Sequence, residues 1–311
     1  MLQNGTITAI RPLLALGLVK SCFLRIGIMH MWKAVAIVAL TLSFAPLAHV
    51  AMAQATPAVI AKDGTYIWTV NFTKGEAPKY RTYIKIAGRQ ADESGDILIT
   101  TRSESKHDVK DVLPDGTATY EQLDVLYAAS FQSMPLPADK KPPVAVVVTF
   151  TKTGLMQKRV NPAADPFDRS QKGIPNFMSL PAPLTPVKLG ESWKAETANL
   201  LVKGQKIAVT QTLVAAEKVL GVDCLKVTAK FVFPTTYGAQ ESEISKVETT
   251  YWVEVKNGQL FKMSTTVLNP LLPFPATKVT SLSVTTRIIA GQNDKEDADG
   301  EKLILAVAKP K

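Results

Sequence analysis

The sequence predicts an all-β protein built from long antiparallel strands. Runs of alternating or β-branched residues recur along most of the chain, and amphipathic helical patterns are almost absent. Turn signals such as Asp115-Gly116 and Asn257-Gly258 separate these runs. A proline-rich segment divides them into two halves of similar length. We therefore expect two curved sheets or half-barrels joined by a Pro-rich crossing.

The start of the chain has the three parts of an export signal. Met31-Trp-Lys33 is a short basic opening, residues 34–45 are apolar, and Ala51-Met-Ala53 forms an A-x-A cleavage site. A membrane-spanning helix needs about twenty apolar residues, and His49 interrupts this run too early. We expect 31–53 to be a signal peptide, preceded by an upstream extension or untranslated segment over 1–30. The mature protein would then be periplasmic or secreted, with no integral membrane span after cleavage.

The first strand-rich unit is expected over 54–160. Its clearest strand is 65–72, where Tyr66, Trp68, Val70 and Phe72 alternate on one face. Burying such side chains contributes about 1.5–3 kcal/mol each, which fixes the face that points inward. Further strands are predicted at 80–86, 96–101, 144–150 and 155–160.

A Pro-rich linker is predicted over 161–190. Pro181, Pro183 and Pro186 each remove a backbone donor and fix φ, so no helix or central strand can run through them. The second β unit follows over 191–292, and a charged tail over 293–311. The strands predicted in the second unit are 207–214, 225–233, 247–255, 259–263 and 277–289, with Asn257-Gly258 as the turn of a two-residue hairpin. A short strand is also expected at 303–307.

Charge and cysteine content exclude several classes of protein. The formal net charge is +9, and about +5 remains once the basic residues of the leader are removed. These basic residues are interleaved with acidic ones, so no run of basic residues is available to contact a nucleic-acid phosphate backbone. Nucleic-acid binding is therefore not expected. The two cysteines are Cys22 in the leader and Cys224. A single mature thiol cannot form an internal disulfide, and its strand-like surroundings favour burial of Cys224.

Three segments carry a resemblance to known proteins. They are 187–193 (VKLGESW), 221–227 (GVDCLKV) and 251–260 (YWVEVKNGQL). Together they resemble exported bacterial proteins of unknown function, which enter a long-stranded antiparallel sheet after a proline. The organisation of the sheet is also similar, more remotely, to the open half-barrels of LolA-type lipoprotein carriers. The resemblance covers about residues 185–268 and implies a fold, without assigning any site residue.

No catalytic residues are predicted. His107 is the sole histidine after Ala53, and its neighbours Lys106, Asp108 and Lys110 favour a solvated imidazole at the surface. Ser103 and Lys106 fit the S-x-x-K motif and residues 152–154 fit K-T-G. In the enzymes that use S-x-x-K the serine opens a helix, whereas this serine lies at the end of a strand-like run. We therefore expect neither His107 nor Ser103 to act in catalysis.

Metal and cofactor sites are not predicted either. Residues 297–300 (DADG) contain part of a calcium loop, but Lys295 and Ala306 occupy the positions of essential ligands. Glu241 and Glu243 are spaced to share one strand face, which in a β protein is more typical of an exposed edge.

Two functions remain open at this point. The first is a non-enzymatic binding or carrier protein for a hydrophobic small molecule or lipid chain, held on the concave face of a curved sheet. The second is an interaction or structural protein of the envelope that presents loops and sheet edges to another protein. The carrier hypothesis rests on aromatic residues that a single twisted sheet would leave on an apolar face. These residues are Trp68, Tyr83, Phe231, Trp252 and Phe261.

Overall fold

The structure is a computed structural model of the chain. It describes residues 58–90, 95–132, 134–135, 145–160, 180–198, 206–234, 244–270, 276–289, 298 and 300–302. Its strands are β1 (Val59–Lys62), β2 (Thr65–Trp68), β3 (Lys79–Gln90), β4 (Asp96–Val112), β5 (Ala118–Phe131), β6 (Met134–Pro135), β7 (Val146–Phe150), β8 (Met156–Val160), β9 (Val187–Lys188), β10 (Ser192–Ala198), β11 (Lys206–Val219), β12 (Val222–Pro234), β13 (Ile244–Glu254), β14 (Leu260–Leu268) and β15 (Ala276–Arg287).

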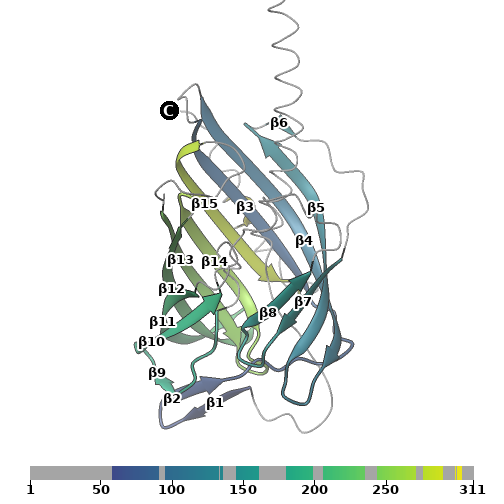
Figure 1. Cartoon of the computed structure of the whole chain (residues 1–311), viewed down its shortest axis with the longest axis vertical. Helices are drawn as coiled ribbons and strands as arrows, with labels where there is room; N and C mark the ends of the chain where they lie inside the picture. Colours follow the sequence, from purple (N-terminus) through teal and green to yellow (C-terminus); the bar gives the residue numbers. More distant parts are fainter. Residues whose placement is uncertain are drawn as a thin grey trace, which may run out of the picture.

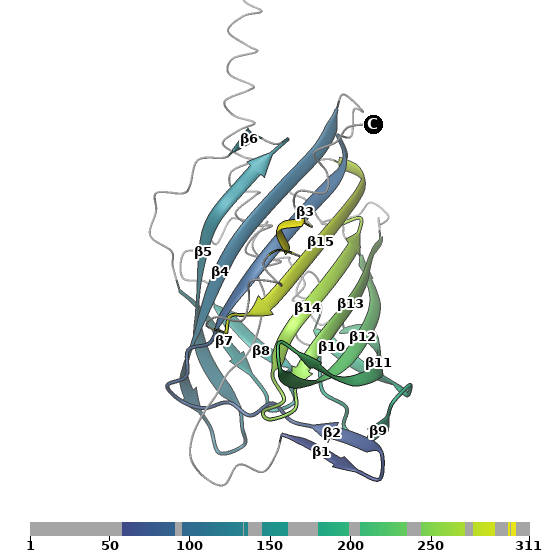
Figure 2. The ribbon, with the colours of Figure 1, turned by 180° about the vertical axis from the view of Figure 1, so that it is seen from behind.

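The predicted fold class, all-β with long antiparallel strands, is confirmed. Twelve strands form one large sheet in the order β10-β11-β12-β13-β14-β15-β3-β4-β5-β7-β8, with β6 beside β5. Figures 1 and 2 show these strands running side by side in one curved sheet, and β1, β2 and β9 forming a small sheet at one end. In the described residues no pairing joins β10 to β8, so the large sheet is open.

The expectation of one sheet for each half of the chain is wrong. β15, from the second half, pairs with β3, from the first, between Ala276↔Gln90 and Arg287↔Tyr80. The two halves therefore share one hydrogen-bonded sheet. We call β10–β14 the C-terminal wing and β4, β5, β7 and β8 the N-terminal wing, with β15 and β3 between them. Much of the Pro-rich linker, 161–179, lies outside the described residues, and the boundaries of the two units stay a prediction.

A short bridge segment, residues 68–73, shows which face of the large sheet is concave. Trp68 packs in an apolar cluster with side chains of the C-terminal wing. Val70 and Phe72 pack in a second cluster with side chains of the N-terminal wing. One segment of six residues can contact both wings only if the sheet curves around it. The face that carries these two clusters is therefore the concave one.

The bridge segment is clipped to turns of both wings by backbone hydrogen bonds. Val70 N donates to Lys152 O in the turn between β7 and β8 at 2.6 Å, and Asn71 N donates to Asn257 O in the turn between β13 and β14 at 2.8 Å. Gly258 permits this approach: it has φ +71°, and a Cβ there would lie 1.8 Å from the Thr69 carbonyl oxygen. Only glycine fits this conformation and spacing.

The hairpin predicted at Asn257-Gly258 is confirmed, but its two-residue turn is wrong. β13 ends at Glu254 and β14 begins at Leu260, and Glu254 N donates to Gln259 O at 2.7 Å across a longer loop. A two-residue type I′ turn needs positive φ at both central residues, and in this loop only Gly258 has it. Asp63-Gly64 and Leu220-Gly221 are the described pairs that do meet this requirement.

Apolar packing is unequal along the concave face. The C-terminal wing contributes most of the largest cluster, which also includes Trp68, Ala182 and Val187. A separate cluster of Ile84, Ile86, Ile97, Ile99 and Val279 lies at the β15-β3-β4 junction. The convex face instead carries ion pairs between neighbouring strands, such as Arg81–Glu104 at 2.7 Å and Lys230–Glu248 at 2.7 Å.

Part of the charged tail packs on the convex face. Gly300 lies against the ring of Tyr83, where a Cβ would approach ring atoms to 2.3 Å. Glu301 pairs with Arg102 at 3.4 Å. The signal peptide, 1–53, and the strand predicted at 303–307 lie outside the described residues, so both stay predictions.

Candidate functional site

The centre of the concave face is a band of small hydroxyl side chains. The register aligns Thr249, Thr265 and Ser283 with Ile84 and Thr101 in one row across five strands. The rows on either side add further serines and threonines at the same depth. We call this set the hydroxyl band; its members are Thr82, Thr101, Ser103, Thr249, Thr265, Ser281, Ser283 and Thr285, all buried.

Some members of the hydroxyl band bond to each other and some do not. Thr249 Oγ1 and Thr265 Oγ1 lie 2.8 Å apart, and Thr82 Oγ1 and Thr285 Oγ1 lie 3.0 Å apart. By contrast, Thr101 Oγ1 and Ser281 Oγ have no hydrogen-bond partner, although each residue is only 1% exposed. Buried hydroxyls are normally satisfied, so these two need an explanation.

A stack of rings crosses the N-terminal wing beside the bridge segment. The ring of Tyr120 lies flat between Phe150, at 5.4 Å between centroids, and His107, at 5.0 Å. Tyr80 continues the stack at 5.1 Å from His107, and Phe72 ends it at 6.5 Å from Phe150. Four strands and the bridge segment thus meet in one continuous aromatic layer.

His107 lies inside this stack, so its predicted exposure is wrong. The residue is 0% exposed, and burial lowers its pKa to about 3. Its Nε2 lies 3.2 Å from Ser105 Oγ, while Nδ1 has no hydrogen-bond partner. Neighbours in a strand point to opposite faces, so Lys106 and Asp108 lie on the convex side while His107 points inward. The charged residues beside it in sequence therefore gave a misleading signal.

A partly buried carboxyl, Asp124, lies next to the stack on β5. It accepts two hydrogen bonds from Gln122 Nε2, at 2.9 and 3.0 Å. Burial raises the pKa of Asp124 to about 7, against the opposing effects of Gln122 and the Arg159 guanidinium. Ser105, His107 and Asp124 therefore share one neighbourhood, but His107 Nδ1 makes no hydrogen bond to Asp124. The orientation that a Ser-His-Asp triad requires is not formed.

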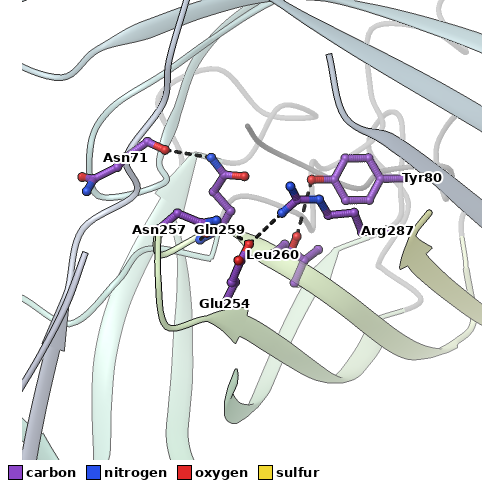
Figure 3. A network of polar contacts seen from close by, with 7 residues as sticks. All are labelled: Asn71, Tyr80, Glu254, Asn257, Gln259, Leu260 and Arg287. Atoms are coloured by element: carbon purple, nitrogen blue, oxygen red, sulfur yellow. Dashed lines mark hydrogen bonds and ion pairs between the residues drawn. The ribbon is translucent and has the colours of Figure 1, made fainter. Parts of the chain in front are cut away.

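A polar network connects the stack to the C-terminal wing (Figure 3). Tyr80 Oη donates to Leu260 O at 3.5 Å, and Gln259 Nε2 donates to Asn71 O at 2.7 Å. Glu254 receives Arg287 Nη1 at 2.7 Å and also Asn257 Nδ2. Nearby, burial raises the pKa of Glu76 to about 7, opposed by Arg287. These contacts hold the bridge segment and the β13–β14 loop in place, which is a structural role.

The other residues singled out in the sequence do not come together. Ser103 faces the concave side, whereas Lys106 lies on the convex face and pairs with Asp108 at 2.7 Å. Residues 152–154 form the turn after β7. Burial of Cys224 is confirmed at 1% exposed, and burial raises its pKa to about 12. Glu241, Glu243 and Asp297 lie outside the described residues.

The five aromatic residues behind the carrier hypothesis divide between the two faces. Trp68 and Phe231 belong to the concave cluster of the C-terminal wing. Tyr83 alternates with Thr82 and Ile84 and therefore lies on the convex face, as does Trp252 beside Tyr251. Phe261 is buried at 1% exposed. The concave face is thus less aromatic than expected.

Other kinds of site were sought in the described part of the chain. Within the described ranges, no three His, Cys, Asp or Glu residues are grouped closely enough to hold a metal ion. None of the helical residues described forms a segment long and apolar enough to cross a bilayer. A small cavity of about 30 Å³ lies where the bridge segment and residues 180–182 meet the C-terminal wing.

Comparisons with known proteins give little further information. No protein-family model matches the chain, and no curated protein matches it. Among solved structures, it is similar to a crystal structure of a protein from Parabacteroides distasonis that is provisionally named a lipoprotein. The identity is 12%, the TM-score is 0.28, and the match covers 70% of this chain and 95% of the other.

Proposed function

We propose that this chain is an exported, non-enzymatic binding protein that carries an apolar ligand or a lipid chain on the concave face of its large sheet. The observation that carries the proposal is the composition of this face. Apolar clusters occupy both wings and the β15-β3-β4 junction, and the rows between them consist mainly of serine and threonine side chains. These side chains point into the concavity of a curved open sheet and are buried there, and a predominantly apolar lining of this kind is typical of sites for apolar ligands.

Export is part of the same proposal. It is supported by the basic opening, apolar run and A-x-A site of residues 31–53. Apolar ligands are poorly soluble in water and need a carrier to cross the aqueous part of the envelope. Such a carrier would need an export signal to reach that compartment.

Titration of the purified full chain with a fluorescent fatty acid tests the proposal. Thr265 and Ser264 are adjacent on β14, one on the concave face and one on the convex face. Thr265→Trp fills the concave face and should weaken binding about tenfold or more, whereas Ser264→Trp should leave it unchanged. Circular dichroism establishes that both variants are folded. The carrier proposal fails if the unmodified protein does not bind the probe, or if both variants bind equally well.

A second function, docking to an envelope protein, is favoured by one observation. Near the small sheet, Leu184 is 83% exposed, Leu189 is 50% exposed and Ile60 is 49% exposed. Leu184 lies between Pro183 and Pro186, which hold the backbone in an extended form at little entropic cost. Leu184→Asp should abolish cross-linking to a partner in intact envelopes, while Val232→Asp, at a convex position 56% exposed, should not.

A further inference from the structure

The two unsatisfied hydroxyls of the hydroxyl band flank the same pair of isoleucines. Thr101 on β4 is paired with Ile84 of β3, and Ser281 on β15 is paired with Ile86 of β3. Since Ile84 and Ile86 are two residues apart, all four side chains project from the concave face. One hydroxyl therefore lies on each side of a short apolar strip.

Burying these hydroxyls without a partner is costly. A buried polar group left unsatisfied destabilises a protein by about 1–3 kcal/mol. Valine and alanine would occupy nearly the same space as Thr101 and Ser281 and would avoid that cost. Their neighbours in the band show the usual solution, since Thr249 bonds Thr265 and Thr82 bonds Thr285. A partner from outside the protein chain would satisfy the two remaining hydroxyls in the same way.

The surroundings restrict the chemistry of that partner. The members of the hydroxyl band are all serines and threonines, and the row neighbours at the β15-β3-β4 junction are isoleucines. Among the ionisable groups described on the concave face, His107, Asp124 and Arg159 belong to the N-terminal wing. Arg287 lies at the end of β15, six residues from Ser281, and pairs with Glu254. A carboxylate or phosphate buried in the band would lack a counter-charge among the residues described there. A neutral hydrogen-bond acceptor fits a hydroxyl donor in this environment.

We propose that Thr101 and Ser281 donate hydrogen bonds to the acyl carbonyl groups of a neutral lipid whose chains lie on the isoleucine cluster. This inference rests on the proposed carrier function and specifies its ligand class. An ester or an amide supplies the same carbonyl acceptor, and an ether of equal chain length does not. The hydroxyls thus select acylated lipids over alkyl lipids.

The experiment compares three competitors of equal chain length for displacement of a neutral fluorescent fatty alcohol from the full-length protein. They are a diacylglycerol, its diamide analogue and a dialkylglycerol ether. Each hydrogen bond contributes about 0.5–1.5 kcal/mol, so the carbonyl lipids should displace the probe roughly tenfold more tightly than the ether. A preference shared by ester and amide supports carbonyl recognition. A preference for one of them alone identifies the source of the carbonyl.

The double variant Thr101→Val, Ser281→Ala should bind the ether as the unmodified protein does, and lose the tenfold preference for carbonyl lipids. The control is Thr100→Val, one residue away on the convex face, which should keep the preference. Equal displacement by ether and ester, or a preference that survives the double variant, overturns this inference while leaving the carrier function intact. If neither kind of lipid displaces the probe, and the probe itself does not bind, the carrier function fails instead. Thermal melts establish that the double variant is folded.

Discussion

The two wings of the large sheet handle buried polar groups differently. In the C-terminal wing, Gln211 is 0% exposed, but it accepts from Tyr251 Oη at 2.6 Å and donates to Pro181 O at 2.8 Å. In the N-terminal wing, His107 is equally buried and its Nδ1 has no partner, and Asp124 has a raised pKa. In the first wing the buried amide of Gln211 is paired on both sides, although Trp193 Nε1 and Gln259 Oε1 have no partner there. The second wing instead buries an imidazole and a carboxyl whose pKa values are shifted by burial. Between the two wings lies the hydroxyl band.

The largest expected effect comes from the point where the wings are joined. Gly258→Ala places a Cβ 1.8 Å from the Thr69 carbonyl oxygen, and residue 258 has a positive φ. Overpacking and backbone strain together should lower the free energy of unfolding by about 3 kcal/mol or more. Gly190→Ala is the control, because Gly190 has φ +82° with nothing within 4 Å. It should lose only about 1–2 kcal/mol. Equal losses in urea unfolding would show that the bridge segment does not hold the wings together.

Tyr251→Phe tests whether the polar pair of the C-terminal wing is structural. The variant keeps the ring and leaves Gln211 Oε1 buried without its donor, so unfolding should require about 1–3 kcal/mol less. Tyr66→Phe, on the small sheet beside the same cluster, should change stability by less than about 0.5 kcal/mol. Urea denaturation of both variants measures the difference. If Tyr251→Phe leaves the free energy of unfolding unchanged, the two wings do not differ as described.

His107→Phe tests the N-terminal wing through pH. The folded protein keeps His107 neutral down to a pKa of about 3, whereas the unfolded chain binds a proton below about 6.5. Stability from this group is therefore present above pH 6.5 and is lost as the pH falls. At pH 5 the loss is about 2 kcal/mol. The variant retains a ring for stacking on Tyr120 and should lose this dependence.

Two carboxyls change the stability with pH in the opposite direction to His107. The stability profile of the variant must therefore be compared with that of the unmodified protein. The raised pKa values of Asp124 and Glu76, each about 7, lower stability as the pH rises from about 4 to 7. They are present in both the unmodified protein and His107→Phe. Subtracting one stability profile from the other isolates His107. A difference that does not change between pH 7 and 5 would contradict burial of a neutral imidazole.

The smallest effects are expected in the hydroxyl band. Ser281→Ala removes an unsatisfied hydroxyl and should leave stability unchanged or raise it by up to about 1 kcal/mol. Thr249→Val removes a satisfied hydroxyl and leaves the Thr265 hydroxyl without this hydrogen-bond partner. The free energy of unfolding should therefore fall by about 1 kcal/mol. Thermal melts of the ligand-free proteins measure both. Equal losses would mean that Ser281 is satisfied in solution.

Sequence patterns predicted many strands but missed β5, which carries much of the N-terminal wing. Strand recognition relies on alternating apolar residues, and the inward positions of β5 include Gln122 and Asp124. The polar residues on the concave side of this wing therefore hide the alternating pattern of the strand that carries them. His107 was misplaced for a related reason, since charged neighbours one residue away point to the other face.

Long-range pairing could not be predicted from local patterns. The β15–β3 ladder joins Arg287 to Tyr80, residues far apart in the chain, and nothing in either strand specifies the other. The hydroxyl band depends on this ladder, because Ser281 and Thr101 approach the same isoleucines only through it. The Asn257-Gly258 hairpin, by contrast, is a local signal and was found.

Extraction and mass spectrometry of lipids that co-purify with the full-length protein test whether the concave face binds a lipid. We expect a stoichiometric acylated lipid in the unmodified protein and in Ser264→Trp, and its loss from Thr265→Trp. Protein that contains no lipid after mild purification, and that takes up none from mixed vesicles, would contradict the claim that the concave face is a binding surface.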